Sequence, residues 1–204
     1  MEAKKIKVLI DNGHGDPPLT GGKCSPDGRL KEYVWCRDVA ARIVNILKGM
    51  GYDAVLVTPE TKDIILKERV RRVNDYCKRY GSKNCLCISV HNNAADSDGK
   101  WHNATGWSGW VAPNASSNSK RLAQLLYKEA ERAGLQGNRC VPAEKYWVGN
   151  WAICRDTNCP TVLTENLFQD NKSEVDYLLT ENGKQTIAML HVKAIINYID
   201  QTKK

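Results

Sequence analysis

Two mainly apolar runs, each leading to a histidine, restrict the possible folds of this chain most strongly. The first run spans residues 6–10 and leads through Asp-Asn-Gly to His14, and the second spans residues 85–90 and leads directly to His91. Such runs are typical of strands that are covered on both faces. Two neighbouring strands that each end in a histidine can offer two imidazoles to one metal ion.

Strand and helix patterns alternate along the chain. The candidate strands are rich in Val, Ile and Leu and span residues 5–10, 52–57, 85–90, 106–112 and 161–164, with a weaker candidate at 146–153. Helical periodicity is found over residues 32–49, 62–80, 117–133 and about 183–200. This order predicts an α/β fold, a three-layer αβα sandwich around a mostly parallel twisted sheet of about six strands. Sheets of this kind bind ligands at the C-terminal ends of their strands.

Charge and length exclude few classes of protein. The 204 residues suit one domain, and the net charge of +7 suits either an acidic polymer or a generic soluble surface, because the basic residues are dispersed. We expect no nucleic-acid binding, since the chain has no basic helix or aromatic-basic motif. We also expect no stable membrane association, because no run approaches about 18 apolar residues.

The eight cysteines divide into two groups. Those expected in the core are Cys36, Cys77, Cys85 and Cys87, and those expected in loops are Cys24, Cys140, Cys154 and Cys159. The loop cysteines lack the paired Cys-x2-Cys spacing of a zinc site, so we expect reduced thiols, and a second metal site remains an open alternative.

Two glutamates complete a candidate zinc site. Glu32 opens the first predicted helix, and Glu165 ends the strand at residues 161–164, so both can reach the sheet edge that carries His14 and His91. A catalytic zinc commonly takes two histidines and one carboxylate and leaves one position for water. One glutamate would then be a ligand and the other a base, but the spacing does not say which.

The remaining histidines have simpler explanations. His191 lies on the buried stripe of the last predicted helix, which predicts a structural role, and His102 lies in a polar loop where solvent contact is expected. Sugar or peptide stacking is possible for the tryptophans of the second half, but packing is the more common role. These are Trp101, Trp107, Trp110, Trp147 and Trp151.

Five segments resemble, in order, motifs of the zinc-dependent N-acetylmuramoyl-L-alanine amidases of the type-3 kind. They are residues 11–15 (Asp-Asn-Gly-His-Gly), Glu32 with its helix, residues 88–94, residues 138–141 and residues 160–171. The family includes bacterial cell-wall hydrolases and phage endolysins. The loop after residue 15 is longer than the family usually has, and Cys140 and Leu167 replace family glycines, which affects expected substrate contacts more than the metal site.

The resemblance implies a function and the role of each residue. It implies zinc bound by His14, Glu32 and His91, and Glu165 as the general base that hydrolyses the amide between N-acetylmuramic acid and L-alanine in peptidoglycan. Asn12, Asn93 and Arg139 are weaker candidates for supporting the ligands or contacting substrate.

The same resemblance guides our predictions of domain organisation, oligomeric state and cellular location. We expect residues 1–204 to form one catalytic domain without a wall-binding module, and the protein to be a monomer. With no signal peptide evident, we expect synthesis in the cytoplasm and action at the cell wall, after phage-type release or after removal of a leader. The alternatives are a zinc exopeptidase of similar architecture and a catalytically silent wall-binding module.

Overall fold

A six-stranded sheet forms the centre of the molecule. The computed structural model describes residues 6–16 and 23–202, and all statements below concern these residues. The strands are β1 (Lys7–Asn12), β2 (Asp53–Leu56), β3 (Cys85–Asn93), β4 (Ser108–Val111), β5 (Trp147–Val148) and β6 (Thr161–Phe168). Their order is β2-β1-β3-β6-β4-β5. The first four strands in this order run parallel, and β4 and β5 run in the opposite direction. The predicted mostly parallel sheet is therefore confirmed.

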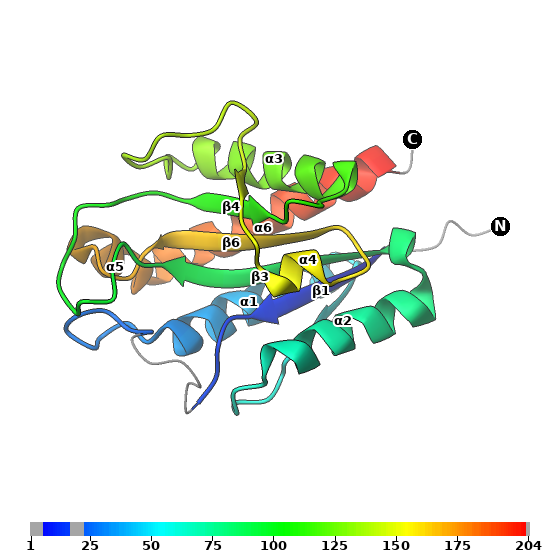
Figure 1. Cartoon of the computed structure of the whole chain (residues 1–204), viewed down its shortest axis with the longest axis horizontal. Coiled ribbons are helices and arrows are strands. Elements are labelled where there is room, and N and C mark those ends of the chain that lie inside the picture. Colours follow the sequence, from blue (N-terminus) through cyan, green and yellow to red (C-terminus); the bar gives the residue numbers. More distant parts are fainter. Residues whose placement is uncertain (1–5, 17–22, 203–204) are drawn as a thin grey trace.

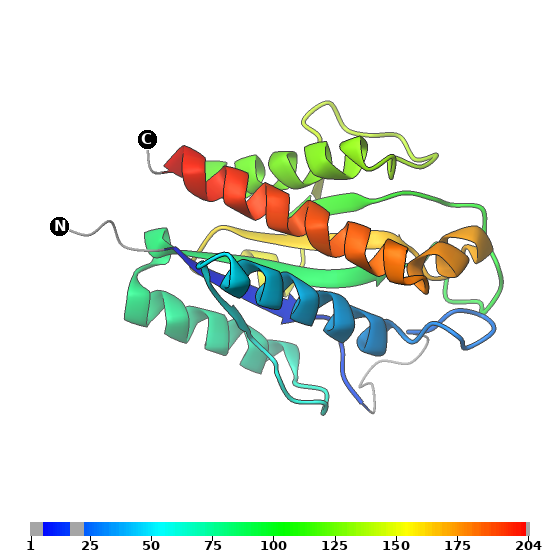
Figure 2. The same ribbon diagram turned by 180° about the vertical axis from the view of Figure 1, so that it is seen from behind.

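Helices cover both faces of the sheet. They are α1 (Glu32–Gly49), α2 (Leu66–Tyr80), α3 (Ser117–Arg132), α4 (Ala152–Arg155), α5 (Lys172–Leu178) and α6 (Glu181–Thr202), with a 3-10 turn, η1 (Ser82–Asn84). Figures 1 and 2 show α1, α3 and α6 on one face and α2 and α4 on the other, with α5 at one end. This arrangement is the predicted αβα sandwich.

The alternation of side chains along the strands divides the core into two apolar layers. Val8, Ile10 and Ile88 point to the layer beneath α1, α3 and α6, whereas Leu9 and Cys87 point to the smaller layer beneath α2 and α4. Successive residues of a strand face opposite sides, so a strand buried on both faces must be apolar at nearly every position. None of the described helices is both long and apolar enough to cross a membrane.

The two strands that carry the predicted site are longer than expected. We predicted that β3 would end at residue 90 and β6 at residue 164, but they continue to Asn93 and Phe168. His91 and Glu165 therefore lie within the ladder, where their Cα atoms are register partners. The polar side chains that suggested these strand ends are compatible with the sheet, because they face one another or a cavity at this edge of the sheet.

Two other expected elements differ. A strand over residues 146–153 is wrong, because β5 stops at Val148 and Gly149 donates its N–H to Val111 O, after which the chain turns into α4. The helix expected over 62–80 begins only at Leu66. Residues 60–62 form a bend before the helix, and Arg69 donates to the carbonyl oxygen of Ile64.

Candidate metal and catalytic site

Three predicted ligands meet in one cluster. The Nδ1 atom of His91 lies 3.1 Å from Oε1 of Glu32, and Nε2 of His14 lies 3.5 Å from the same oxygen. One potential ligand atom from each residue lies within 4.8 Å of the others, and this is the one such group found among the described residues. The second oxygen of Glu32, Oε2, is buried without a hydrogen-bond partner. Two imidazoles, one carboxylate and an unpaired buried oxygen fit a divalent metal such as zinc.

Three separate elements bring these ligands together. His14 follows β1 by two residues in a left-handed conformation with φ 56°, and Glu32 is the first residue of α1. Gly13 passes the His91 ring so closely that a Cβ there would lie 2.5 Å from Nδ1. Glycine is therefore required at this point of the chain. The Glu32 N–H donates to Lys23 O, which returns the chain to the sheet edge.

A chain of hydrogen bonds determines which nitrogen of His91 faces the cluster. The Ser89 hydroxyl donates to Asp11 Oδ2 at 2.7 Å, because an ionised carboxylate can only accept. Ser89 Oγ then accepts from Nε2–H of His91 at 3.1 Å. The neutral ring consequently keeps its lone pair on Nδ1, the nitrogen beside Glu32.

Asp11 is itself held by a buried ion pair. Nη1 of Arg69 lies 2.8 Å from Asp11 Oδ1, and Nη2 of Arg69 lies 3.0 Å from Asp63 Oδ1 and from the carbonyl oxygen of His14. All three charged side chains are at most 7% exposed. The same guanidinium therefore supports the backbone of one histidine and, through Asp11 and Ser89, the ring of the other.

Glu165 lies one strand away from this cluster. It is partly buried beside His91 in the ladder, and its Oε2 atom is shielded from solvent without a hydrogen-bond partner. Burial raises the pKa of Glu165 well above its ordinary value, and the negative charge of Glu32 raises it further. The positive charges of Lys23 and Arg139 act in the opposite direction.

Glu32 has the opposite electrostatic character. Burial by itself would raise the pKa of Glu32, but the interactions of its carboxylate with the adjacent His14 and His91 rings outweigh burial and lower the pKa below the ordinary value. The pKa of Glu32 is thus lowered and that of Glu165 is raised. A pair of carboxylates whose pKa values are driven apart is typical of a site where each has a different role.

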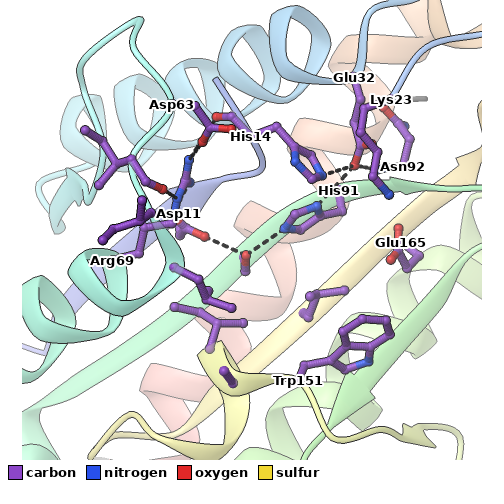
Figure 3. A pocket seen from close by; sticks show the side chains of 17 residues that line it. Asp11, His14, Lys23, Glu32, Asp63, Arg69, His91, Asn92, Trp151 and Glu165 are labelled. Atoms are coloured by element: carbon purple, nitrogen blue, oxygen red, sulfur yellow. Dashed lines mark hydrogen bonds and ion pairs between the residues drawn. The ribbon is translucent and has the colours of Figure 1, made fainter. Parts of the chain in front are cut away.

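These side chains line one cavity with a volume of about 390 Å³. His14, Glu32, His91 and Glu165 form its polar part, together with Lys23 and the network around Arg69 (Figure 3). Its apolar part consists of Ile64, Ile65, Leu66, Trp151, Ala152, Ile153 and Leu163. The cavity opens at the C-terminal ends of the parallel strands, as predicted.

The three weaker candidates lie outside the described lining of this cavity. The amide of Asn12 lies 2.9 Å from Oγ1 of Thr58, and Asn93 Oδ1 accepts from the N–H of Ala94. Arg139 packs its guanidinium 5.5 Å from the ring centre of Phe168, and its positive charge acts to lower the pKa of Glu165.

The other histidines lie where we expected them. His191 is fully buried, donates from Nδ1 to Ile187 O at 2.7 Å and accepts from Thr164 at 3.0 Å. His102 is partly exposed and lies 2.9 Å from Asp98.

The cysteines are all unpaired. Cys36, Cys77, Cys85 and Cys87 are buried as predicted. The expected loop position is wrong for Cys154, which lies within α4, and both Cys154 and Cys159 are buried. No cysteine belongs to a metal-ligand cluster among the residues described.

The sequence analysis missed Ser89, Arg69 and the loop before α2 as parts of the site. Ser89 could have been found, because it precedes His91 by two residues and must share its face of the strand. Arg69 and Ile65 could not have been predicted from the sequence, because only the packing of α2 against β1 and β3 brings them to the cavity.

Comparisons with known proteins agree with this geometry. Residues 8–197 match the family described as N-acetylmuramoyl-L-alanine amidase. The endolysin of Bacillus phage SPP1 is 28% identical over 206 residues, which cover 97% of this chain and 67% of the endolysin. The sporulation-specific N-acetylmuramoyl-L-alanine amidase of Bacillus subtilis strain 168 is 24% identical over 93% of this chain and 67% of its own length.

Solved structures share the fold. The N-acetylmuramoyl-L-alanine amidase from Clostridium difficile 630 superposes with a TM-score of 0.81 at 23% identity, covering 97% of this chain and 98% of that protein. The catalytic domain of CwlV from Bacillus (Paenibacillus) polymyxa var. colistinus gives 0.76 at 24% identity, covering 96% and 98%. Since the family match spans most of the chain, this protein belongs to the N-acetylmuramoyl-L-alanine amidases and is a peptidoglycan amidase.

Proposed function

We propose that this amidase is zinc-dependent, with His14, Glu32 and His91 as the ligands and Glu165 as the general base. The bond it cleaves would join the lactyl group of N-acetylmuramic acid to L-alanine of the stem peptide. The observation that carries the proposal is the cluster of three ligand atoms within 4.8 Å, in the same cavity as Glu165, whose Oε2 atom is shielded and has no hydrogen-bond partner. We further propose residues 1–204 as a single catalytic domain, supported by the family match over residues 8–197 and by the continuous sheet.

Each side chain has a distinct task in this proposal. His14 would bind through Nε2 and His91 through Nδ1, because Ser89 already occupies the Nε2–H of His91. A zinc ion held there would supply Lewis-acid polarisation of the substrate carbonyl and lower the pKa of an attacking water to about 7. Glu165 would accept the proton of that water and deliver it to the leaving nitrogen. Its raised pKa suits a group that must both take up and release a proton.

The test separates metal binding from proton transfer. Wild-type protein should release stem peptides with a free L-alanine amine from sacculi, and a chelator should abolish this release until zinc is restored. Glu165→Gln should bind zinc as the wild type does but lose activity by at least about 100-fold. Glu144→Gln changes an exposed acid outside the cavity lining and should leave both properties unchanged.

Two outcomes would contradict the proposal. Normal cleavage by Glu165→Gln would remove Glu165 from the reaction. Full activity in the presence of a chelator that strips the protein of metal would remove zinc from it.

A further inference from the structure

The apolar part of the cavity is exposed to an unusual degree. Seven large hydrophobic side chains of the described residues are exposed, and three of them line this cavity: Ile65 (57%), Leu66 (48%) and Trp151 (43%). The metal-ligand cluster needs none of these side chains. Apolar side chains gathered in an open cavity beside polar groups are typical of a ligand-binding surface.

The Trp151 ring is exposed and yet fixed in place. It meets the Trp110 ring edge to face, with ring centres 6.1 Å apart at an angle of 89°. A Cβ on Gly149 would lie 2.5 Å from Nε1 of Trp151, so the indole rests directly on the backbone there. The Trp151 carbonyl also accepts the N–H groups of Cys154 and Arg155 at the start of α4. Such a ring can bind a ligand without losing much conformational entropy.

The position of this ring relates it to one arm of the substrate. Figure 3 shows Trp151 on the opposite side of His91 from Glu32 and Lys23, and Glu165 lies between Trp151 and the polar end of the cavity. An amide held at Glu165 therefore has one flanking group directed toward Trp151. The two groups that flank the amide are a muramic acid sugar ring and a stem peptide that begins with alanine.

We propose that Trp151 is the stacking surface of a saccharide subsite that binds the N-acetylmuramic acid ring beside the cleaved amide. This inference rests on the proposed function. A pyranose ring presents a face of C–H groups whose size matches an indole, whereas the methyl group of L-alanine would cover little of it. Ile65 and Leu66 add exposed apolar surface to the same cavity, which would suit the methyl groups of the sugar's acetyl and lactyl substituents.

The first experiment compares two substrates that differ only in the sugar. One is an N-acetylmuramoyl peptide, and the other is a lactoyl peptide with the same amino acids. Trp151→Ala should raise KM for the sugar-containing substrate about tenfold with little change in kcat. KM for the lactoyl peptide should stay unchanged, and Trp151→Phe should recover part of the loss.

Trp101→Ala is the matched control, because Trp101 is similarly exposed (37%) but lies outside the described lining of the cavity. It should behave as the wild type on both substrates. Thermal unfolding of each variant verifies that it is folded. The inference is overturned if Trp151→Ala matches the wild type on the sugar-containing substrate, or if it impairs both substrates equally.

The second experiment needs no catalysis. A peptide-free glycan of alternating N-acetylglucosamine and N-acetylmuramic acid, titrated against the protein, should change the tryptophan fluorescence of the wild type and Trp101→Ala but not of Trp151→Ala. A glycan that binds through Trp151 to a protein without amidase activity would support the subsite and refute the proposed function. Equal glycan binding by Trp151→Ala, in an active wild type, would refute the subsite alone.

Discussion

Ser89 is a small residue with a large effect on the geometry of this site. Its hydroxyl accepts from His91 and donates to Asp11, whose other oxygen is paired with Arg69. Groups that hold the second nitrogen of a metal-binding histidine fix both its tautomer and its ring orientation. The buried network around Ser89 therefore prepares His91 to present Nδ1 before any metal arrives.

We predict that Ser89→Ala weakens zinc affinity by about 10- to 100-fold, because the His91 ring loses its tautomer restraint. Competition with a chromophoric chelator measures this directly. Ser108→Ala is the matched control: Ser108 is equally buried and accepts from the Trp110 indole, so its loss should lower stability but leave zinc affinity unchanged. Unaltered zinc affinity in Ser89→Ala would show that the restraint is unnecessary.

At the scale of elements, the central strands were predictable and the far edge of the sheet was not. β1, β3 and β6 each contain an apolar run because helices cover both faces, and these runs identify the strands without tertiary information. The C-terminal limits of β3 and β6 were missed because Asn92 and Asn166 are buried polar residues whose partners lie on the neighbouring strand: Asn92 donates to Asn166 O, and Asn166 donates to His91 O. The direction of β4 and the length of β5 depend on how β4 pairs with β6 and β5, and the residues within these strands do not indicate that pairing.

The packing of α6 against the sheet has a pH dependence that can be measured. Burial lowers the pKa of His191 from 6.5 to about 4, while its Nδ1–H stays bound to Ile187 O. The folded state thus holds His191 neutral where the unfolded chain would protonate it. The resulting stability is fully present above about pH 6.5 and is lost as the pH falls toward 4, a decrease of about 3 kcal/mol.

Denaturant unfolding at a series of pH values tests this prediction. The free energy of unfolding of His191→Gln should fall less steeply between pH 6.5 and 4 than that of the wild type. His102→Gln replaces a partly exposed histidine and should keep the wild-type slope. An identical slope in His191→Gln and the wild type would contradict the assignment.

At the scale of the whole molecule, the metal-ligand cluster joins parts that are far apart in sequence. His14 follows β1, Glu32 begins α1 and His91 lies in β3, so one ion would tie two strands and a covering helix together. An ion that binds only the folded state stabilises it, by about 4 kcal/mol when its concentration is 1,000 times Kd.

We therefore predict that chelation lowers the Tm of the wild type by about 10 °C and that added zinc restores it. Differential scanning calorimetry with and without chelator provides the measurement. His14→Ala should unfold at a temperature that no longer depends on chelator. A wild-type Tm that changes with neither chelator nor zinc would contradict the prediction that a metal ion bound at this cluster stabilises the fold.

The sequence alone predicted the αβα sandwich and the central strands, and it pointed to His14, Glu32, His91 and Glu165 as candidates for one site, which the structure brings to one cavity. It could do so because burial on both faces imposes an apolar pattern, and because motif order resembles a known family over most of the chain. Tertiary structure alone decided which nitrogen of His91 is free, how the pKa values of Glu32 and Glu165 separate, and that Trp151 rather than Trp107 faces the cavity. These properties arise from burial and from contacts between segments that are distant in the sequence, and neighbouring residues in the sequence predict neither of them.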